Sequence, residues 1–305
     1  MTTTRSVVVG LRTLEPVPAR VGRSAQPWLW MSIAAAVIAA AGSIVGLAAA
    51  ASIYGRETAA FLDQAIAQDI VNVVVVSPAI VVSALLARRG SLIAWLIWLG
   101  AMAFTVYNYV IYTLSIHAGP LFLAWVAVLG LSLYALIGGL LALDPRSIGA
   151  RFVSAPRRTV GWFLIVVAAL FCGLWLTGIV PALLSGQVPA AARDLGLPSS
   201  PVHVLDLAFY LPATFTAGVL LLRNRAVGYV FAPALLGFLA LTGLPIIVTP
   251  FVASQRGDTP AWAVLAPITA VTIITTGLLF RLLSATRNPA VRSSTPAKSG
   301  SDNRA

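Results

Sequence analysis

Charged residues are scarce in this 305-residue chain: only 10% are Asp, Glu, Lys or Arg, whereas 59% are hydrophobic. A soluble domain needs about a quarter charged residues to cover its surface. The mean hydropathy is +0.93, and the apolar runs are long and continuous, as expected for helices that satisfy their backbone hydrogen bonds within a bilayer. The composition therefore excludes a soluble fold and predicts an all-α integral membrane protein.

Side chains for metal binding and redox chemistry are also scarce. The single cysteine, Cys172, excludes an intramolecular disulfide and a Cys-based zinc site, and two histidines exclude a three-histidine site. The sequence contains no P-loop, no dinucleotide-binding glycine motif, no His-Glu-x-x-His and no nucleophile elbow. We therefore predict no catalytic residue and no cofactor, and favour a non-enzymatic role.

Eight apolar runs are long enough to cross a bilayer, which takes about 20 helical residues. Placing the N-terminus inside puts 17 of the 20 basic residues on the inner side, leaving Arg56, Arg193 and Arg256 outside. The net charge of +11 is therefore a topology signal rather than the mark of a nucleic-acid partner. We predict a multi-pass protein of the cytoplasmic membrane with both termini cytosolic and the lipid bilayer as its partner. The predicted spans are 28–54, 70–87, 91–116, 121–143, 160–184, 204–222, 226–248 and 261–283.

An internal duplication is the second prediction. A shift of 134 residues aligns Pro78 with Pro212 and Arg89 with Arg223 without gaps. Four spans per copy give two parallel four-helix repeats related by an axis along the membrane normal, which predicts sites at the interface between copies. The predicted organisation is a disordered tail at 1–27, repeat 1 at 28–143, a basic cytosolic linker at 144–159, repeat 2 at 160–283 and a second disordered tail at 284–305.

Polar side chains within the spans recur at equivalent positions. Asn72 precedes Arg89 by 17 residues and Asp206 precedes Arg223 by 17, which at 1.5 Å per residue places both about 25 Å above the inner boundary. Because polar groups in hydrocarbon are costly, they favour a functional role. We predict an outward-facing ligand pocket lined by Asn72, Asn108, Tyr112, His203, Asp206, Tyr210 and Thr242.

The same residues fit other interpretations. Hydrogen bonding between helices explains them equally well without a ligand. His117, His203 and Asp206 are weaker candidates for a haem or metal site. The leading hypothesis is a protein that binds, senses or carries a small solute or cation. The alternatives are a structural or accessory subunit and, third, a haem- or metal-binding protein or membrane-embedded enzyme.

Two stretches carry a resemblance. One runs from Tyr107-Asn108-Tyr109 through the segment 117–123 to Leu131-Ser132-Leu133-Tyr134, and the other covers 203–225. Both resemble stretches of uncharacterised bacterial (actinobacterial-like) polytopic membrane proteins, and the resemblance covers about the central half of the chain. It implies a membrane-embedded helical fold and no particular activity.

Separately, residues 58–70 have the pattern of an amphipathic lead-in helix, either a lid or an interfacial filler.

Overall fold

The computed structural model describes residues 26–152 and 154–286. In this part of the chain eight helical segments are long and apolar enough to cross a membrane, and no strand is formed. The predicted all-helical membrane class is therefore confirmed. The elements are α1 (Gln26–Ala48), α2 (Ala50–Tyr54), α3 (Ala59–Val71), η2 (Asn72–Val76), α4 (Ser77–Arg88), α5 (Leu92–Ser115), α6 (Phe122–Leu141), α7 (Pro145–Gly149), α8 (Arg157–Leu184), α9 (Ala190–Arg193), α10 (Pro201–Leu205), η3 (Asp206–Tyr210), α11 (Leu211–Leu222), α12 (Gly228–Arg256), η4 (Trp262–Val264) and α13 (Leu265–Ser284).

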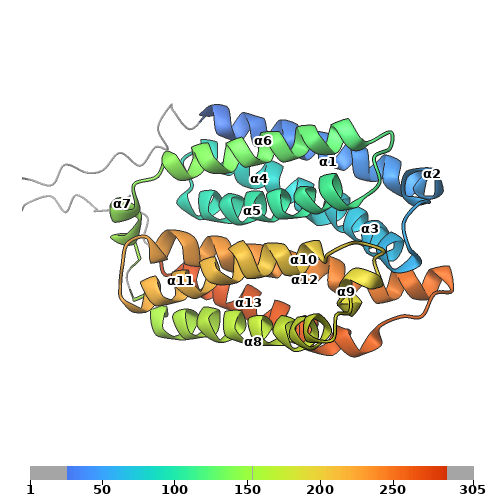
Figure 1. Ribbon diagram of the computed structural model, residues 1–305. Coiled ribbons are helices and arrows are strands. Elements are labelled where there is room, and N and C mark those ends of the chain that lie inside the picture. The colour runs from blue at the N-terminus through green and yellow to red at the C-terminus, as the bar shows by residue number, and fades with distance from the viewer. Residues whose placement is uncertain (1–25, 153, 287–305) are drawn as a thin grey trace, which may run out of the picture.

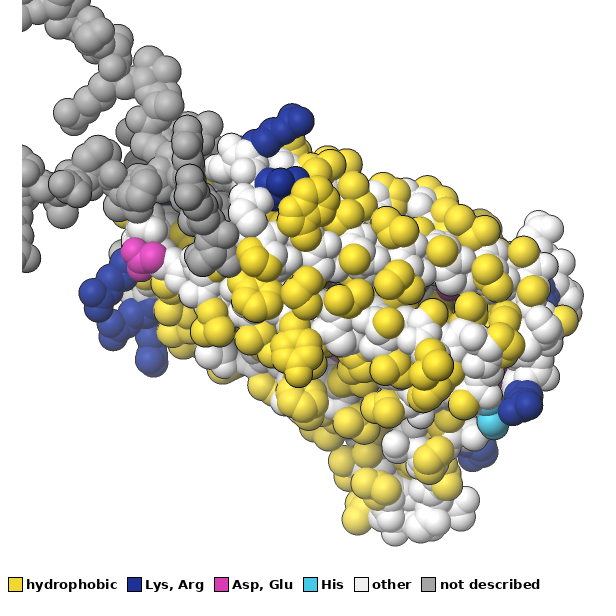
Figure 2. Space-filling view, turned by 90° about the horizontal axis from the view of Figure 1, so that it is seen from above, with side chains coloured by type: hydrophobic (Ala, Val, Ile, Leu, Met, Phe, Trp, Pro, Cys, Tyr) yellow, Lys and Arg dark blue, Asp and Glu magenta, His cyan; other side chains and the backbone are white. Residues whose placement is uncertain are grey.

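The long helices lie side by side, with α7 at one end of the bundle and α2 and α9 at the other (Figure 1). We call these the α7 end and the α2 end. An apolar band lies between them on the face seen in Figure 2, and Lys and Arg side chains gather toward the ends. Of the 12 described arginines, Arg56, Arg193 and Arg256 lie in or beside the connections at the α2 end, and the other nine lie at the α7 end. This distribution fits a bundle whose waist contacts lipid.

The first four spans form a closed bundle in which α1 packs against both α4 and α6, and α5 packs against both as well. Helix α5 is the most buried span. Its Trp95 and Trp98 are fully buried, and the Trp98 indole donates a 2.9 Å hydrogen bond to the Ser32 hydroxyl on α1. This bond satisfies the buried Trp98 indole and fixes α5 against α1, whereas the Trp95 indole nitrogen has no partner among the described residues.

The last four spans are arranged more openly. Helix α8 packs closely on α11, where a Cβ added at Gly218 would meet the carbonyl oxygen of Gly161. In contrast, α8 and α13 touch each other little, and together more than half of their residues are exposed. Helix α12 joins the two halves because it packs against α3 and α5 as well as α11 and α13. The second half is therefore held to the first mainly through α12.

Two π-helical segments interrupt the second and sixth spans. They are η2 and η3, they begin at Asn72 and Asp206, and each is followed directly by a 12-residue α-helix with proline in its first turn. A proline has no N–H to donate and its ring crowds the carbonyl four residues earlier. The wider π turn before Pro78 and Pro212 lets the helix continue. The bounds of η2 and η3, and of α4 and α11, differ by 134 residues, in the register of the predicted duplication, which stays a prediction.

Several predicted boundaries are wrong. The second span begins at Ala59 rather than residue 70, because α3 runs straight into η2 and α4. The segment 58–70 is therefore no lid: it is buried on α1 and α12 and begins at Thr58, whose hydroxyl accepts from the Phe61 N–H at 3.3 Å. The first span ends at Ala48, before the separate helix α2. Gln26 and Ser284 are helical, and the rest of both predicted tails lies outside the described residues except for Pro27, Ala285 and Thr286.

Candidate functional site

A carboxylate at Asp69 lies in the interior of the first half. The residue has no exposed surface. The Tyr54 hydroxyl donates to one carboxylate oxygen at 2.6 Å, and the Tyr112 hydroxyl donates to the other at 3.0 Å. Both oxygens of Asp69 are thus hydrogen-bonded by phenols that come from α2 and α5, so the carboxylate ties three elements together.

The surroundings of Asp69 are closely packed. Trp125 stacks on Tyr54, with ring centroids 6.3 Å apart, and meets Tyr112 edge-on at 5.4 Å. On α1, a Cβ at Gly46 would collide with the Asp69 carboxylate and the Tyr54 hydroxyl, so only glycine lets the helices approach here. Burial and then the charge of Asp69 raise the pKa of Tyr54, which lies in the connection at the α2 end, so its phenol stays a donor.

An amide chain continues this cluster toward α1. The Gln68 amide donates to the Asn72 side-chain oxygen at 3.0 Å, and the Asn72 amide donates to the Ser43 hydroxyl at 3.2 Å. All three side chains are buried. We call Ser43, Tyr54, Gln68, Asp69, Asn72 and Tyr112 the Asp69 cluster.

A second carboxylate lies between the halves. Asp206 begins η3 and is buried, with 8% of its surface exposed. The Trp175 indole on α8 donates to one carboxylate oxygen at 2.8 Å, and the Tyr107 hydroxyl on α5 donates to the other at 3.0 Å. Because an indole N–H can only donate, the oxygen facing Trp175 remains an acceptor, and a proton on this carboxyl would sit on the oxygen facing Tyr107.

Aromatic rings surround Asp206 on several sides. Phe238 of α12 stacks on Tyr210 at 4.1 Å between centroids and meets Tyr107 edge-on at 5.2 Å. His203 packs on Trp175 at 4.6 Å. We call Tyr107, Trp175, His203, Asp206, Tyr210 and Phe238 the Asp206 cluster.

Two hydroxyls lie beside Asp206. The Tyr210 hydroxyl and the Thr214 hydroxyl, four residues further along the same span, are both buried and face one another, and neither bonds to any other group within the described part of the chain. A buried polar group left unsatisfied costs about 1–3 kcal/mol. Water or a ligand completes such groups, and the buried polar atoms of Ser77, Trp95, Asn108 and Thr275 are in the same state; at the Asp206 cluster the Tyr210 oxygen can accept a further hydrogen bond.

Neither carboxylate pairs with a cation in residues 26–152 and 154–286. The ion pairs there involve other acids and lie toward the α2 end: Arg256 Nε lies 2.8 Å from Asp63, and the His117 ring lies 2.9 Å from Glu57. No group of three or more His, Cys, Asp or Glu side chains comes together among these residues. His117 and His203, the histidines of the metal alternative, thus contact different partners, Glu57 and Trp175.

Five of the seven predicted pocket residues belong to the two clusters. Asn72 and Tyr112 belong to the Asp69 cluster, whereas His203, Asp206 and Tyr210 belong to the Asp206 cluster. The remaining two bond to neither. The Thr242 hydroxyl bonds to the Phe238 carbonyl of its own helix at 2.9 Å, and the Asn108 amide is buried without a partner among the described residues.

Important members of both clusters were missing from the sequence-based set. One missing member is Asp69, the central carboxylate of its cluster. The others are Tyr54, which donates to Asp69, and Trp175, which donates to Asp206. Asp69 was visible as an acidic residue one turn from Asn72. Trp175 was not recognisable, because a tryptophan in an apolar run more often packs against lipid or core.

Comparison of the chain with protein-family models, with curated proteins and with solved structures gives no match. The function must therefore be inferred from the geometry.

Proposed function

We propose that the protein binds a small organic cation, a protonated amine, at the Asp206 cluster, as the binding step of a carrier or sensor in the membrane. One observation carries the proposal: a buried carboxylate inside a membrane-spanning segment has only neutral donors and no described cationic partner. An ionised group in hydrocarbon needs a countercharge, and ionisable residues there commonly mark the path of a substrate or ion.

The ring-lined environment favours an organic ammonium over a metal ion. Hard metal cations such as Ca²⁺ take six to eight oxygen ligands, whereas Asp206 has one carboxylate with the Tyr107 hydroxyl beside it. Ammonium groups are attracted to aromatic faces, best to tryptophan. Trp175, Tyr107 and Tyr210 offer such faces next to the charge.

The location of the cluster also supports a binding role. Asp206 is bonded from α5 in the first half and from α8 in the second, so it lies at the junction of the predicted repeats. Ligand sites of duplicated membrane proteins are found at such junctions. With the arginine-rich α7 end inside, as the positive-inside rule favours, Asp206 lies in the half of the bundle that faces outward.

A binding measurement tests the proposal on the full chain in lipid nanodiscs. Methylammonium is the probe for the protonated amine, and tetraethylammonium, which has no N–H, tests the carboxylate and aromatic faces alone; the shift of the unfolding temperature with probe concentration gives each affinity. We expect the wild-type protein to be stabilised, the Asp206→Asn variant to lose the shift, and the Tyr210→Phe variant to bind methylammonium more weakly because it lacks the spare hydroxyl.

Asp69→Asn is the matched control, since it makes the same change in the other cluster. It should unfold at a lower temperature but keep the amine-dependent shift. An Asp206→Asn variant that responds to amines like the wild-type protein would refute the proposal.

The structural or accessory-subunit interpretation rests on a different observation. Helices α8 and α13 expose large apolar side chains along most of their length, including Trp162, Leu170 and Phe280. Lipid covers such faces adequately, but a partner subunit would cover them as well. This interpretation predicts that amines change no property of the protein and that Asp206→Asn affects stability alone.

A further inference from the structure

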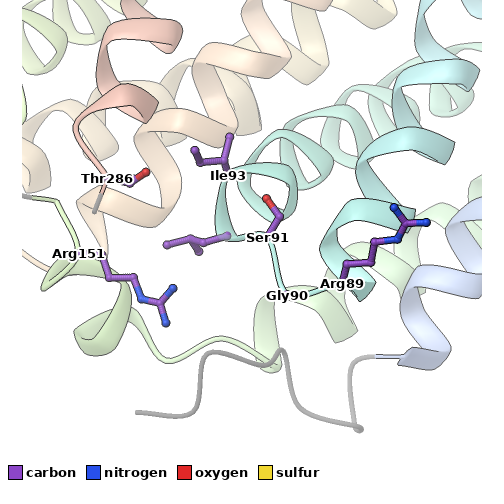
Figure 3. Close-up of a pocket in the computed structure, with 7 residues that line it drawn as sticks. Arg89, Gly90, Ser91, Ile93, Arg151 and Thr286 are labelled. Carbon is purple, nitrogen blue, oxygen red and sulfur yellow. The ribbon is translucent and has the colours of Figure 1, made fainter. Parts of the chain in front are cut away.

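A basic cavity opens at the α7 end. None of its lining residues belongs to the Asp69 cluster or the Asp206 cluster. The cavity has a volume of about 270 Å³ and lies where the α4–α5 connection, the segment after α7 and the end of α13 meet. Arg89 and Arg151 flank it, with Ser91, Ile93 and Thr286 between them (Figure 3). The backbone bridge between Phe152 and Thr286 holds the segment after α7 against the end of α13 and so shapes this cavity.

No acidic side chain among the described residues neutralises the positive charge of the cavity. Arg89 is exposed and Arg151 half-buried, and no carboxylate in the described residues pairs with either. Asp144, the acid of this end, instead accepts from the N–H groups of Arg146 and Ser147 at the start of α7. The Arg89 side chain extends away from Arg151 in Figure 3, so Arg151 is the guanidinium placed to bind a phosphate in the cavity through paired N–H donors, and Arg89 adds positive charge at its edge.

The Ser91 hydroxyl in the cavity can still donate a hydrogen bond. The Ser91 oxygen accepts from the Ala94 N–H at 3.2 Å, and its own O–H is not used in a bond to any described residue. That proton can be donated to a phosphate oxygen. The Thr286 hydroxyl, by contrast, already donates to the Leu283 carbonyl at 2.7 Å.

Apolar side chains make the same cavity suitable for a lipid. Leu92 and Ile93 line it, and Ile93 is 41% exposed at the start of a membrane-spanning helix. A site that combines arginines at a bilayer boundary with an exposed apolar side chain suits a headgroup above its acyl chains. Basic pockets between transmembrane helices bind anionic headgroups in this way.

We infer that the cavity between Arg89 and Arg151 binds the phosphate of an anionic phospholipid headgroup. Arg151 and the Ser91 hydroxyl bind the phosphate oxygens, Arg89 adds positive charge at the edge of the site, and the acyl chains lie along Leu92 and Ile93. The site is independent of the amine proposed at Asp206.

Lipid binding to the full chain, purified in detergent, tests this inference by native mass spectrometry. The probes are phosphatidylglycerol, phosphatidylcholine and inorganic phosphate. We expect wild-type protein to prefer phosphatidylglycerol, and the double variant Arg89→Gln/Arg151→Gln to lose at least about tenfold in affinity for it. Arg89→Lys/Arg151→Lys keeps the charge without the paired donors and should fall between the two.

The control is the double variant Arg223→Gln/Arg225→Gln. Arg223 follows α11 as Arg89 follows α4, with nearly the same backbone angles, and neither Arg223 nor Arg225 lines this cavity. This variant removes the same net charge and should bind phosphatidylglycerol like wild type. Equal loss in both double variants would overturn the inference, as would equal binding of phosphatidylcholine. Displacement of the lipid by millimolar inorganic phosphate would assign the arginines to a soluble phosphate instead.

Discussion

The two buried carboxylates occupy similar helices but have different surroundings. Asp69 is fully buried in the first half and bonded by two phenols, which themselves pack on Trp125. Asp206 lies between the halves, bonded by one phenol and one indole, with an unpartnered Tyr210 hydroxyl one turn away. The first cluster satisfies its own polar groups, whereas the second does not.

This difference separates a structural role from a binding role. A fully satisfied polar network inside a membrane fixes the helices that contribute to it, and opening it would leave several groups without partners. A network with an unused hydroxyl oxygen gains when an ammonium group arrives, because that oxygen can accept from an ammonium N–H. The comparison therefore predicts that changes around Asp69 alter stability and that changes around Asp206 alter binding.

The largest expected effect on stability is at Gly46. An alanine there would place its Cβ against the Asp69 carboxylate and the Tyr54 hydroxyl, both held by their mutual hydrogen bond. We expect Gly46→Ala to lower the free energy of unfolding by about 1–3 kcal/mol, the usual cost of overpacking. Thermal unfolding of the full chain in detergent measures it.

Gly42→Ala is the control for this substitution. Gly42 lies one turn earlier on α1, and a Cβ there meets nothing within 4 Å. Its replacement should be neutral or slightly stabilising, because alanine favours a helix by about 1 kcal/mol over glycine. Equal unfolding temperatures for the two variants would show that the approach of α1 to Asp69 is not tight.

Smaller effects are expected when a hydrogen-bond donor to each carboxylate is replaced. One replacement should change stability and the other should change binding. Tyr112→Phe removes one hydrogen bond to Asp69 and should cost about 0.5–1.5 kcal/mol of stability without changing amine affinity. Trp175→Phe removes the indole that orients Asp206 and weakens the cation–π face, so amine affinity should fall roughly tenfold. If Tyr112→Phe weakened amine binding as much as Trp175→Phe, the two clusters would not be separate in function.

Much of the fold could be predicted from the sequence, because hydropathy and span length follow directly from the absence of water in the bilayer. The eight spans were placed correctly, apart from their ends. The second span was begun too late, at residue 70, since the polar side chains of Asp63, Gln68 and Asp69 look like a loop until their partners are known. A polar residue inside a bundle costs little once it is hydrogen-bonded, and hydropathy does not register such bonds.

The candidate site was only partly predictable, for a related reason. Depth along a helix follows from counting residues, so Asn72 and Asp206 were identified as polar residues within the spans. The neighbour across the bundle depends on helix rotation, which the π segments at Asn72 and Asp206 also change. Sequence alone therefore did not separate Tyr112, which bonds to Asp69, from Tyr107, which bonds to Asp206.

The most direct test of the account is chemical labelling of the two carboxyls. A hydrophobic carbodiimide enters the bilayer and forms an adduct with carboxyl groups that it can reach, and peptide mass spectrometry locates the adduct. We predict labelling at Asp206 that is suppressed by tetraethylammonium, a probe that cannot itself react with the activated carboxyl, and no labelling at Asp69 in the folded protein. Labelling of Asp69 at the same rate, or labelling of Asp206 that tetraethylammonium does not reduce, would contradict the assignment of one carboxylate to structure and the other to binding.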